Sequence, residues 1–256
     1  MWQLEGTRVR WNSDRFRGEL DLADPNNGLR ILGWGSESIG NARILQLGWL
    51  AETSSDNELV TSEELASEEL ASEHFIRGNE LIVSYAGSGA IQFQISLSVT
   101  DDPQAVDAII IEACLSVQTD LLDVNPRVQI GSSLPGERWA RVRIDRPPAR
   151  VGALAPDDWE SVDSDESGCA LLFRFPGHSL SFGQIIQADD FINAGLVSDS
   201  AEQAPRLEAG LFPGKLEKGV LRRARIRALL MSRERDEPFL AEQLDQFSQT
   251  TPPLGA

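Results

Sequence analysis

His178 lies in a Pro176–Gly177–His178 turn between two apolar runs, and it is one of only two histidines in the chain. Loops that a rigid scaffold positions often carry site residues, and an imidazole titrates near neutral pH. The position predicts a general acid or base, and an exposed histidine in a turn is the alternative interpretation. The other histidine, His74, follows an acidic stretch and lies in no motif.

Arginines recur at alternate positions in two segments of the sequence. The residues are Arg141 and Arg143 beside Trp139, and Arg223, Arg225 and Arg227. Alternate residues of a strand project from the same face, so each set would form a row. Such a row can bind a carboxylate or phosphate of a ligand, or it can pair with Asp and Glu of neighbouring strands on a solvated face.

Six tryptophans against one tyrosine are the other unusual feature of the composition. An indole at the mouth of a cleft is a platform for a sugar ring, and filling of the core is the alternative. The tryptophans are Trp2, Trp11, Trp34, Trp49, Trp139 and Trp159.

The sequence predicts neither a metal site nor a cofactor site. Asp163–Gly168 resembles the first half of a calcium-binding loop, but Arg174 stands where the bidentate glutamate is required. There is no P-loop, no GxSxG, no HExxH and no glycine-rich dinucleotide motif. Cys114 and Cys169 lie in apolar runs, which is typical of free buried thiols.

The net charge of -17, from 40 acidic and 23 basic residues, limits the classes of partner. It argues against nucleic acid and against an anionic membrane surface, because both need a basic protein surface. A neutral ligand, a cation or a basic protein partner fits better. No apolar run approaches the length of about 18 residues that spans a bilayer, and no signal peptide is evident, so we expect a cytoplasmic protein.

Most of the sequence consists of short segments in which apolar and polar residues alternate, which is typical of the strands that would position these side chains. In IQFQISLSV, residues 91–99, the odd positions are apolar and would face inward, and the even positions are Gln and Ser and would face outward. Other expected strands cover residues 4–12, 16–22, 29–34, 43–50, 74–83, 108–117, 127–130, 138–145, 169–175 and 180–186. The pattern predicts an all-β fold, a large antiparallel β-sandwich or supersandwich that forms a single domain over residues 1–256.

Residues 218–231 fit two kinds of element. Alternation of Ala224, Ile226 and Ala228 with the arginines predicts a strand, and the strand-like neighbours favour it. A stripe that includes Leu221, Ala228 and Leu229 has helical spacing, so a helix remains the alternative.

Two further segments depart from the strand pattern. Residues 51–73 carry eight acids and no base, which indicates an acidic insertion that is mobile or forms a solvated helix, with a basic binding partner as the alternative. Residues 236–249 predict a short C-terminal helix, with Asp236 as N-cap and Leu240, Leu244 and Phe247 on one face.

Two stretches resemble the galactose mutarotase-like supersandwich group, which includes aldose epimerases and domains of polysaccharide lyases and glycosidases. GELDLADPNNGLRILGW is similar to the opening hairpin of those proteins, and LFPGKLEKGVLRRARIRALL to their closing strand. Family enzymes use two histidines and a carboxylate in a sugar cleft. The resemblance therefore implies His178 as acid or base, Glu208 or Glu217 as the carboxylate, and Arg223 or Arg225 orienting the substrate.

The sequence thus favours a protein that binds or processes a carbohydrate, with a sugar as its ligand. The alternative is a non-enzymatic interaction module that uses the acidic insertion or the arginine-rich face to bind a protein partner. The shortage of histidines argues against an enzyme, and any activity would be like that of a sugar epimerase or mutarotase. The oligomeric state is left open.

Overall fold

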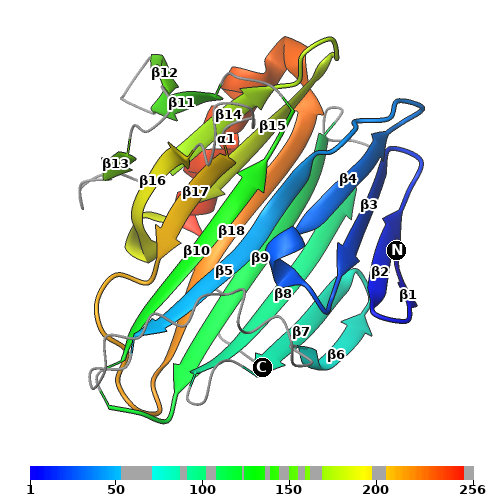
Figure 1. Cartoon of the computed structure of the whole chain (residues 1–256). Coiled ribbons are helices and arrows are strands. Elements are labelled where there is room, and N and C mark those ends of the chain that lie inside the picture. Colours follow the sequence, from blue (N-terminus) through cyan, green and yellow to red (C-terminus); the bar gives the residue numbers. More distant parts are fainter. Residues whose placement is uncertain are drawn as a thin grey trace.

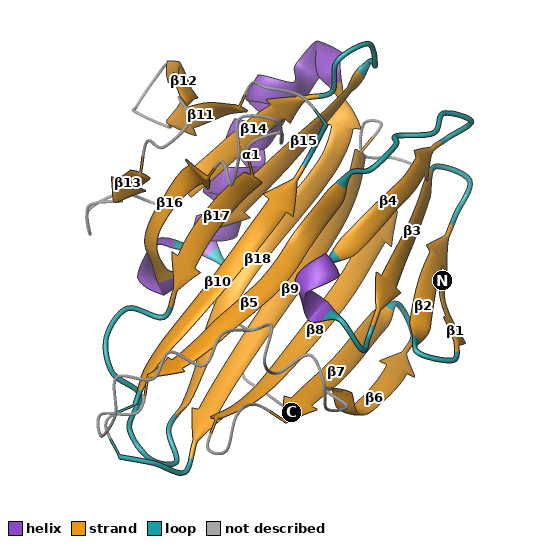
Figure 2. Ribbon diagram, in the orientation of Figure 1, coloured by secondary structure: helices purple, strands orange, loops and turns teal. Residues whose placement is uncertain are grey.

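The structure is a computed structural model, and it describes residues 1–52, 71–86, 91–101, 108–122, 124–135, 139–143, 150–154, 159–161, 169–197 and 206–250. Two antiparallel sheets of nine strands each pack face to face, as Figures 1 and 2 show. The prediction of an all-β sandwich with one short C-terminal helix is confirmed.

The strands of each sheet follow the chain only in part. Sheet A has the order β1 (Trp2–Glu5), β2 (Arg8–Asn12), β3 (Phe16–Asp21), β4 (Leu29–Trp34), β5 (Arg43–Glu52), β10 (Asn125–Ser133), β17 (Arg206–Leu211), β16 (Phe191–Val197) and β13 (Trp159–Ser161). Sheet B has the order β12 (Arg150–Leu154), β11 (Trp139–Arg143), β14 (Cys169–Arg174), β15 (Leu180–Ile186), β18 (Leu221–Ser232), β9 (Ala108–Thr119), β8 (Ile91–Asp101), β7 (Glu80–Ala86) and β6 (Ala71–Arg77).

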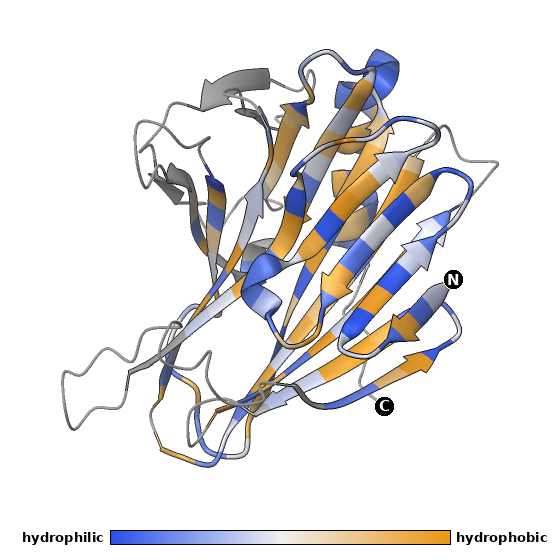
Figure 3. Cartoon of the chain, turned by 45° about the vertical axis from the view of Figure 1, so that its right-hand side comes forward, coloured by the Kyte–Doolittle hydropathy of each residue, from blue (hydrophilic) through white to orange (hydrophobic). Residues whose placement is uncertain are grey.

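Alternation along the strands builds the main core between the sheets. Hydrophobic and hydrophilic bands follow one another along the strands in Figure 3, and the inward residues of both sheets form one buried cluster. In β8 the buried residues are Ile91, Phe93, Ile95, Leu97 and Val99, as the sequence predicts.

The segment that was ambiguous between strand and helix is the strand β18. It lies between β15 and β9 near the middle of sheet B. Ala224, Ile226 and Ala228 point into the main core, and the arginines that alternate with them point to the outer face. Tertiary pairing with two long neighbours outweighs the helix propensity of its Ala, Leu and Arg residues.

Helix α1 (Asp236–Gln249) covers part of the outer face of sheet B and builds a second buried cluster there. Leu240, Leu244 and Phe247 pack on Leu229 and Met231 of β18. The predicted bounds of this helix and its apolar face are confirmed. Three short 3-10 helices also occur in the described chain: η1 (Pro25–Asn27), η3 (Ala188–Asp190) and η4 (Arg233–Arg235).

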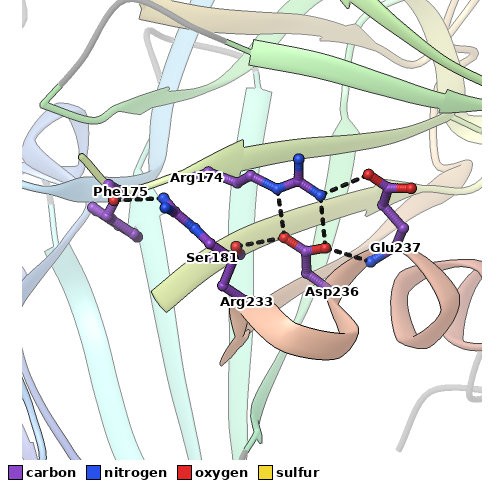
Figure 4. Close-up of polar contacts among 6 residues, drawn as sticks. All are labelled: Arg174, Phe175, Ser181, Arg233, Asp236 and Glu237. Carbon is purple, nitrogen blue, oxygen red and sulfur yellow. Dashed lines mark hydrogen bonds and ion pairs between the residues drawn. The ribbon is translucent and has the colours of Figure 1, made fainter. Parts of the chain in front are cut away.

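The start of α1 differs from the predicted N-cap, because Arg235 takes the cap position and Asp236 is the first helical residue. The Asp236 carboxylate accepts hydrogen bonds from Arg174 Nε at 2.8 Å, from Arg174 Nη2 at 2.9 Å and from Ser181 Oγ at 2.7 Å (Figure 4). It also accepts the backbone N–H of Glu237 at 2.7 Å. Asp236 therefore fastens the helix to β14 and β15.

Two segments expected as single strands are hairpins. Residues 4–12 divide between β1 and β2, and residues 74–83 divide between β6 and β7. Gly6 and Gly78 have φ values of 64° and 63°, which reverse the chain inside an apparently continuous alternation. Strands β12, β13, β16 and β17 were not expected at all.

Of the predicted acidic insertion, residues 53–70 lie outside the described residues. The flanking residues belong to strands, because β5 extends to Glu52 and β6 begins at Ala71. Within the described part of the chain, none of the helices has both the length and the apolar character that crossing a membrane requires.

Candidate functional site

A row of polar side chains crosses five strands on the outer face of sheet B. Arg223 of β18 lies opposite Ser116 of β9, which lies opposite Gln94 of β8. Gln94 lies opposite Ser84 of β7, and Ser84 lies opposite Glu73 of β6. Neighbouring strands are about 4.8 Å apart, so the four steps of this row span about 19 Å. The row has a guanidinium at one end and a carboxylate at the other.

A hollow of about 540 Å³ lies over this row, and we call it the polar hollow. Its lining residues are the five of the row together with Gln92, Gln118, Leu221, Tyr85 and Phe93. Gln94 Nε2 donates a hydrogen bond to Ser84 Oγ at 3.2 Å, which orients both groups on the floor. Amide, hydroxyl, carboxylate and guanidinium groups together offer both donors and acceptors to a ligand.

Of the three arginines on the outer face of β18, Arg225 and Arg227 are held under α1. Arg225 Nη1 donates to the backbone oxygen of Thr250 at 2.9 Å, and its guanidinium lies 4.5 Å from the centre of the Phe247 ring. Arg227 lies 4.7 Å from the same ring, and its Nε donates to Glu112 Oε1 at 3.0 Å. The side chains of Arg225 and Arg227 are both buried. Of the three arginines on the outer face of β18, Arg223 lines the polar hollow.

Two titratable groups near these arginines have raised pKa values. Burial raises the pKa of Asp190, against the effect of the backbone N–H of Arg225, which donates to its Oδ2 at 3.0 Å. Burial also raises the pKa of the Cys114 thiol, and the charges of Arg223 and Arg225 oppose that shift only in part. Cys114 is a free thiol that stays protonated at neutral pH, so it is a poor nucleophile.

No group of three or more metal-ligating side chains occurs among the described residues. The segment 163–168, whose pattern resembles half of a calcium loop, lies outside them.

His178 lies in the turn between β14 and β15, away from the residues that line the polar hollow. Its Nδ1 is 2.9 Å from Glu37 Oε2, and Glu37 belongs to the connection between β4 and β5. The contact therefore joins a turn of sheet B to a loop of sheet A.

The two candidate glutamates lie elsewhere. Glu208 of β17 alternates with Leu207 and Ala209, which are in the main core, so it projects from the outer face of sheet A, opposite the polar hollow. Its carboxylate forms an ion pair with Arg206. Glu217 is exposed between β17 and β18. Within the described chain, no hydrogen bond or ion pair joins His178 to either glutamate.

The other predicted binding residues, Trp139, Arg141 and Arg143, are on strand β11 between β12 and β14. Their side chains lie outside the part of the chain that can be described. Of the remaining tryptophans, three are in the main core, namely Trp2, Trp11 and Trp49, and Trp34 packs against it.

Comparisons with known proteins bear on the fold. Neither the family models nor the curated proteins include a match to this sequence. A solved galactose mutarotase-like protein from Lactobacillus casei ATCC 334 superposes with a TM-score of 0.52 and 9% identity, over 87% of this chain and 99% of that one. The chain has the galactose mutarotase-like fold. A protein from Klebsiella pneumoniae assigned as an aldose 1-epimerase agrees, with a TM-score of 0.50, 9% identity, and coverage of 99% and 90%.

The resemblance seen in the sequence is thus confirmed for the mutarotase-like fold. The segment 18–34 forms the antiparallel pair β3–β4, and the segment 211–230 contributes to the long strand β18. At 9% identity, the likeness establishes the fold and not the activity.

Sequence reasoning missed most of the polar hollow. Gln92, Gln94 and Gln118 carry no motif, and an outward Gln or Ser on a strand is typical of a solvated face. The alternation in residues 91–99 placed two of these glutamines on the correct face. Only the register across five strands brings them next to Arg223 and Glu73.

Proposed function

We propose that this mutarotase-like protein binds a carbohydrate in the polar hollow. The observation that carries the proposal is the row from Arg223 to Glu73, whose side chains offer donors and acceptors along the floor of a 540 Å³ hollow. Ligand pockets commonly measure about 300–1,000 Å³. Sugar hydroxyls both donate and accept hydrogen bonds, which matches Gln and Ser side chains. Structural neighbours described as galactose mutarotase-like and as aldose 1-epimerase support the sugar class.

The dimensions of the row favour a ligand with more than one sugar ring. A row of about 19 Å is longer than a single ring, so one monosaccharide cannot contact both ends. Charged groups at the ends bind hydroxyls more strongly than neutral ones do. Phe75 lies two residues from Glu73 along β6, on the same face of the strand, and is 50% exposed, so an aromatic side chain lies beside the Glu73 end of the row, where a sugar ring can pack on it.

We further propose binding without turnover. An epimerase-like proton transfer needs an acid and a base that reach the same ring. His178 contacts Glu37 at hydrogen-bonding distance, away from the polar hollow, and Glu208 projects from the outer face of sheet A. Neither side chain can therefore reach a sugar bound in the hollow. If the protein is catalytic, His178 with Glu208 or Glu217 would have to form an active site outside the polar hollow. Loss of anomer interconversion in His178→Ala, followed by NMR, would support that catalytic alternative.

The alternative of a protein-interaction module that uses the arginine-rich face has less support. Arg225 and Arg227 are buried and bonded beneath α1, so an approaching partner would have to displace the helix first.

The test is calorimetric titration and thermal shift with neutral oligosaccharides, uronic acid oligomers and single sugars. A ligand at 100 times its dissociation constant stabilises the native state by about 2.7 kcal/mol. We expect Gln94→Ala and Arg223→Ala each to weaken binding about tenfold, because each removes a hydrogen-bonding group. Gln129→Ala, which changes an exposed glutamine of sheet A, is the matched control and should bind normally. Unchanged binding in all three variants would place the site outside the polar hollow, and no binding to any sugar would reject the function.

A further inference from the structure

Strand β6 is the last strand of sheet B in the described part of the chain. Among the described strands it pairs with β7 alone. Phe75 and Ile76 of this strand are adjacent large apolar side chains, and they are 50% and 36% exposed. An edge strand presents unpaired N–H and C=O groups that can bind another strand.

The sequence of β6 is complementary to itself. In the segment Glu73–Arg77, an antiparallel pairing centred on Phe75 would place Glu73 opposite Arg77, and His74 opposite Ile76, of a second copy. Opposite charges directly across a strand pair stabilise it, and aromatic pairs do the same. We propose that β6 pairs with β6 of a second copy of this chain in this register, so that sheet B continues from one protomer into the next.

The hairpin geometry supports the same register. The loop between β6 and β7 has two residues, Gly78 and Asn79, so Arg77 and Glu80 form the hydrogen-bonded closing pair. Hydrogen-bonded and non-hydrogen-bonded pairs alternate, so the backbone of Phe75 also points to β7, and the backbones of His74 and Ile76 point to the free edge. These two residues would exchange hydrogen bonds across the interface, and the two Phe75 side chains would meet at the close, non-hydrogen-bonded position.

The interface would also touch the polar hollow. Glu73 ends the row on the hollow floor, and the pairing places the partner's Arg77 beside it. Two-fold symmetry closes the contact, because each copy supplies the same strand. The assembly is therefore a dimer and not an open fibre. The pairing is argued from the edge strand itself and not from the ligand, but it brings the partner's Arg77 and the two Phe75 side chains to the end of the polar hollow that Glu73 lines.

Charge reversal tests the register. Glu73→Arg and Arg77→Glu each replace two opposite-charge pairs by two like-charge pairs, and we expect each to raise the dimer dissociation constant about tenfold in sedimentation equilibrium. The double variant Glu73→Arg/Arg77→Glu restores both pairs and should dimerise like the unchanged chain. Glu217→Arg, an exposed acid elsewhere, is the control. Glu73, Arg77 and Glu217 are all exposed, so we expect each variant to fold normally. Far-ultraviolet circular dichroism checks this. A chain that stays monomeric at every attainable concentration, or a dimer that ignores both single reversals, overturns the proposal.

Cysteine trapping gives a second test. Residues opposite each other at a non-hydrogen-bonded position have Cα atoms about 4.5 Å apart, within the range that a disulfide spans. Phe75→Cys should therefore form a disulfide dimer on mild oxidation. Glu73→Cys and Arg77→Cys should each fail alone and form a dimer when mixed. The unchanged chain controls for its own thiols. Cross-linking of Glu73→Cys with itself would overturn this register.

Discussion

At the scale of single residues, Gly28 shows how closely the opening hairpin approaches its neighbour. Gly28 has φ 58° and ψ -165°, a combination that is essentially restricted to glycine. A Cβ atom there would lie 2.4 Å from Ile44 O and 2.7 Å from Gln46 N, both backbone atoms of β5. The connection between β3 and β4 thus has two separate reasons to place glycine at position 28.

We expect Gly28→Ala to lower the free energy of unfolding by about 3 kcal/mol, because backbone strain and a backbone clash add together. Gly6→Ala is the matched control. Gly6 has a positive φ of 64° and no atom within 4 Å of its Cβ position, so strain alone should cost about 1 kcal/mol. Urea denaturation measures both variants. Equal losses would show that the approach of β5 is no constraint.

At the scale of elements, helix α1 depends on a carboxylate at its first residue. Burial raises the pKa of Asp236. The hydrogen bonds from Arg174 and Ser181, together with the positive charge of Arg174, lower it by more, so the pKa is lowered overall. A lowered pKa in the folded state means that the ionised form stabilises the fold. This stability is present above the unfolded-state pKa and is lost as the pH falls through the folded-state value.

We therefore expect Asp236→Asn to lower the free energy of unfolding by about 2 kcal/mol at neutral pH. The difference from the unchanged protein should begin to shrink as the pH falls below the unfolded-state pKa of about 3.9, because the carboxylate of the unfolded chain is protonated first. It should vanish once the pH is below the lowered pKa of the native carboxylate, where both states are protonated. Glu237→Gln removes a more exposed carboxylate from the same Arg174 and should cost less than about 1 kcal/mol. Urea denaturation over this pH range provides the measurement. A difference that stays constant with pH would contradict the assigned role of the charge.

The sequence predicted well those strands and helices whose conformation follows from the local pattern of apolar and polar residues. The alternation in β8 and the apolar stripe of α1 are local patterns, and they gave correct elements. The hairpin β6–β7 was missed because only Gly78 and Asn79 interrupt its alternation. Strand β17, RLEAGL, is short and contains glycine, so its pairing with β10 and β16 decides its conformation.

At the scale of the whole molecule, long-range pairing determines the candidate site. Arg223 and Glu73 are far apart in the sequence, and only the order β18, β9, β8, β7, β6 places them at the two ends of one row. The catalytic candidates were chosen by residue type and family resemblance. They remain a prediction, and the structure separates His178 and Glu208 onto different parts of the sandwich.

The two sheets are also joined by a polar contact inside the main core. Ser132 of β10 donates a hydrogen bond from Oγ to Gln184 Oε1 of β15 at 2.8 Å, and both side chains are fully buried. Gln184 Nε2 has no partner among the described residues. A buried amide that is only partly bonded makes its remaining hydrogen bond costly to lose.

We expect Ser132→Ala to destabilise the fold by about 1–3 kcal/mol, because it leaves the fully buried Gln184 oxygen without its Ser132 partner. Adding Gln184→Leu should recover much of this loss, since removal of both partners leaves no unsatisfied group on either side. The control is Ser133→Ala in the same strand, which breaks a similar 2.6 Å bond to Gln46 at a partly exposed position and should cost less than about 1 kcal/mol. Urea denaturation of the single and double variants gives the coupling energy. Strictly additive losses would mean that the hydrogen bond does not hold the two sheets together.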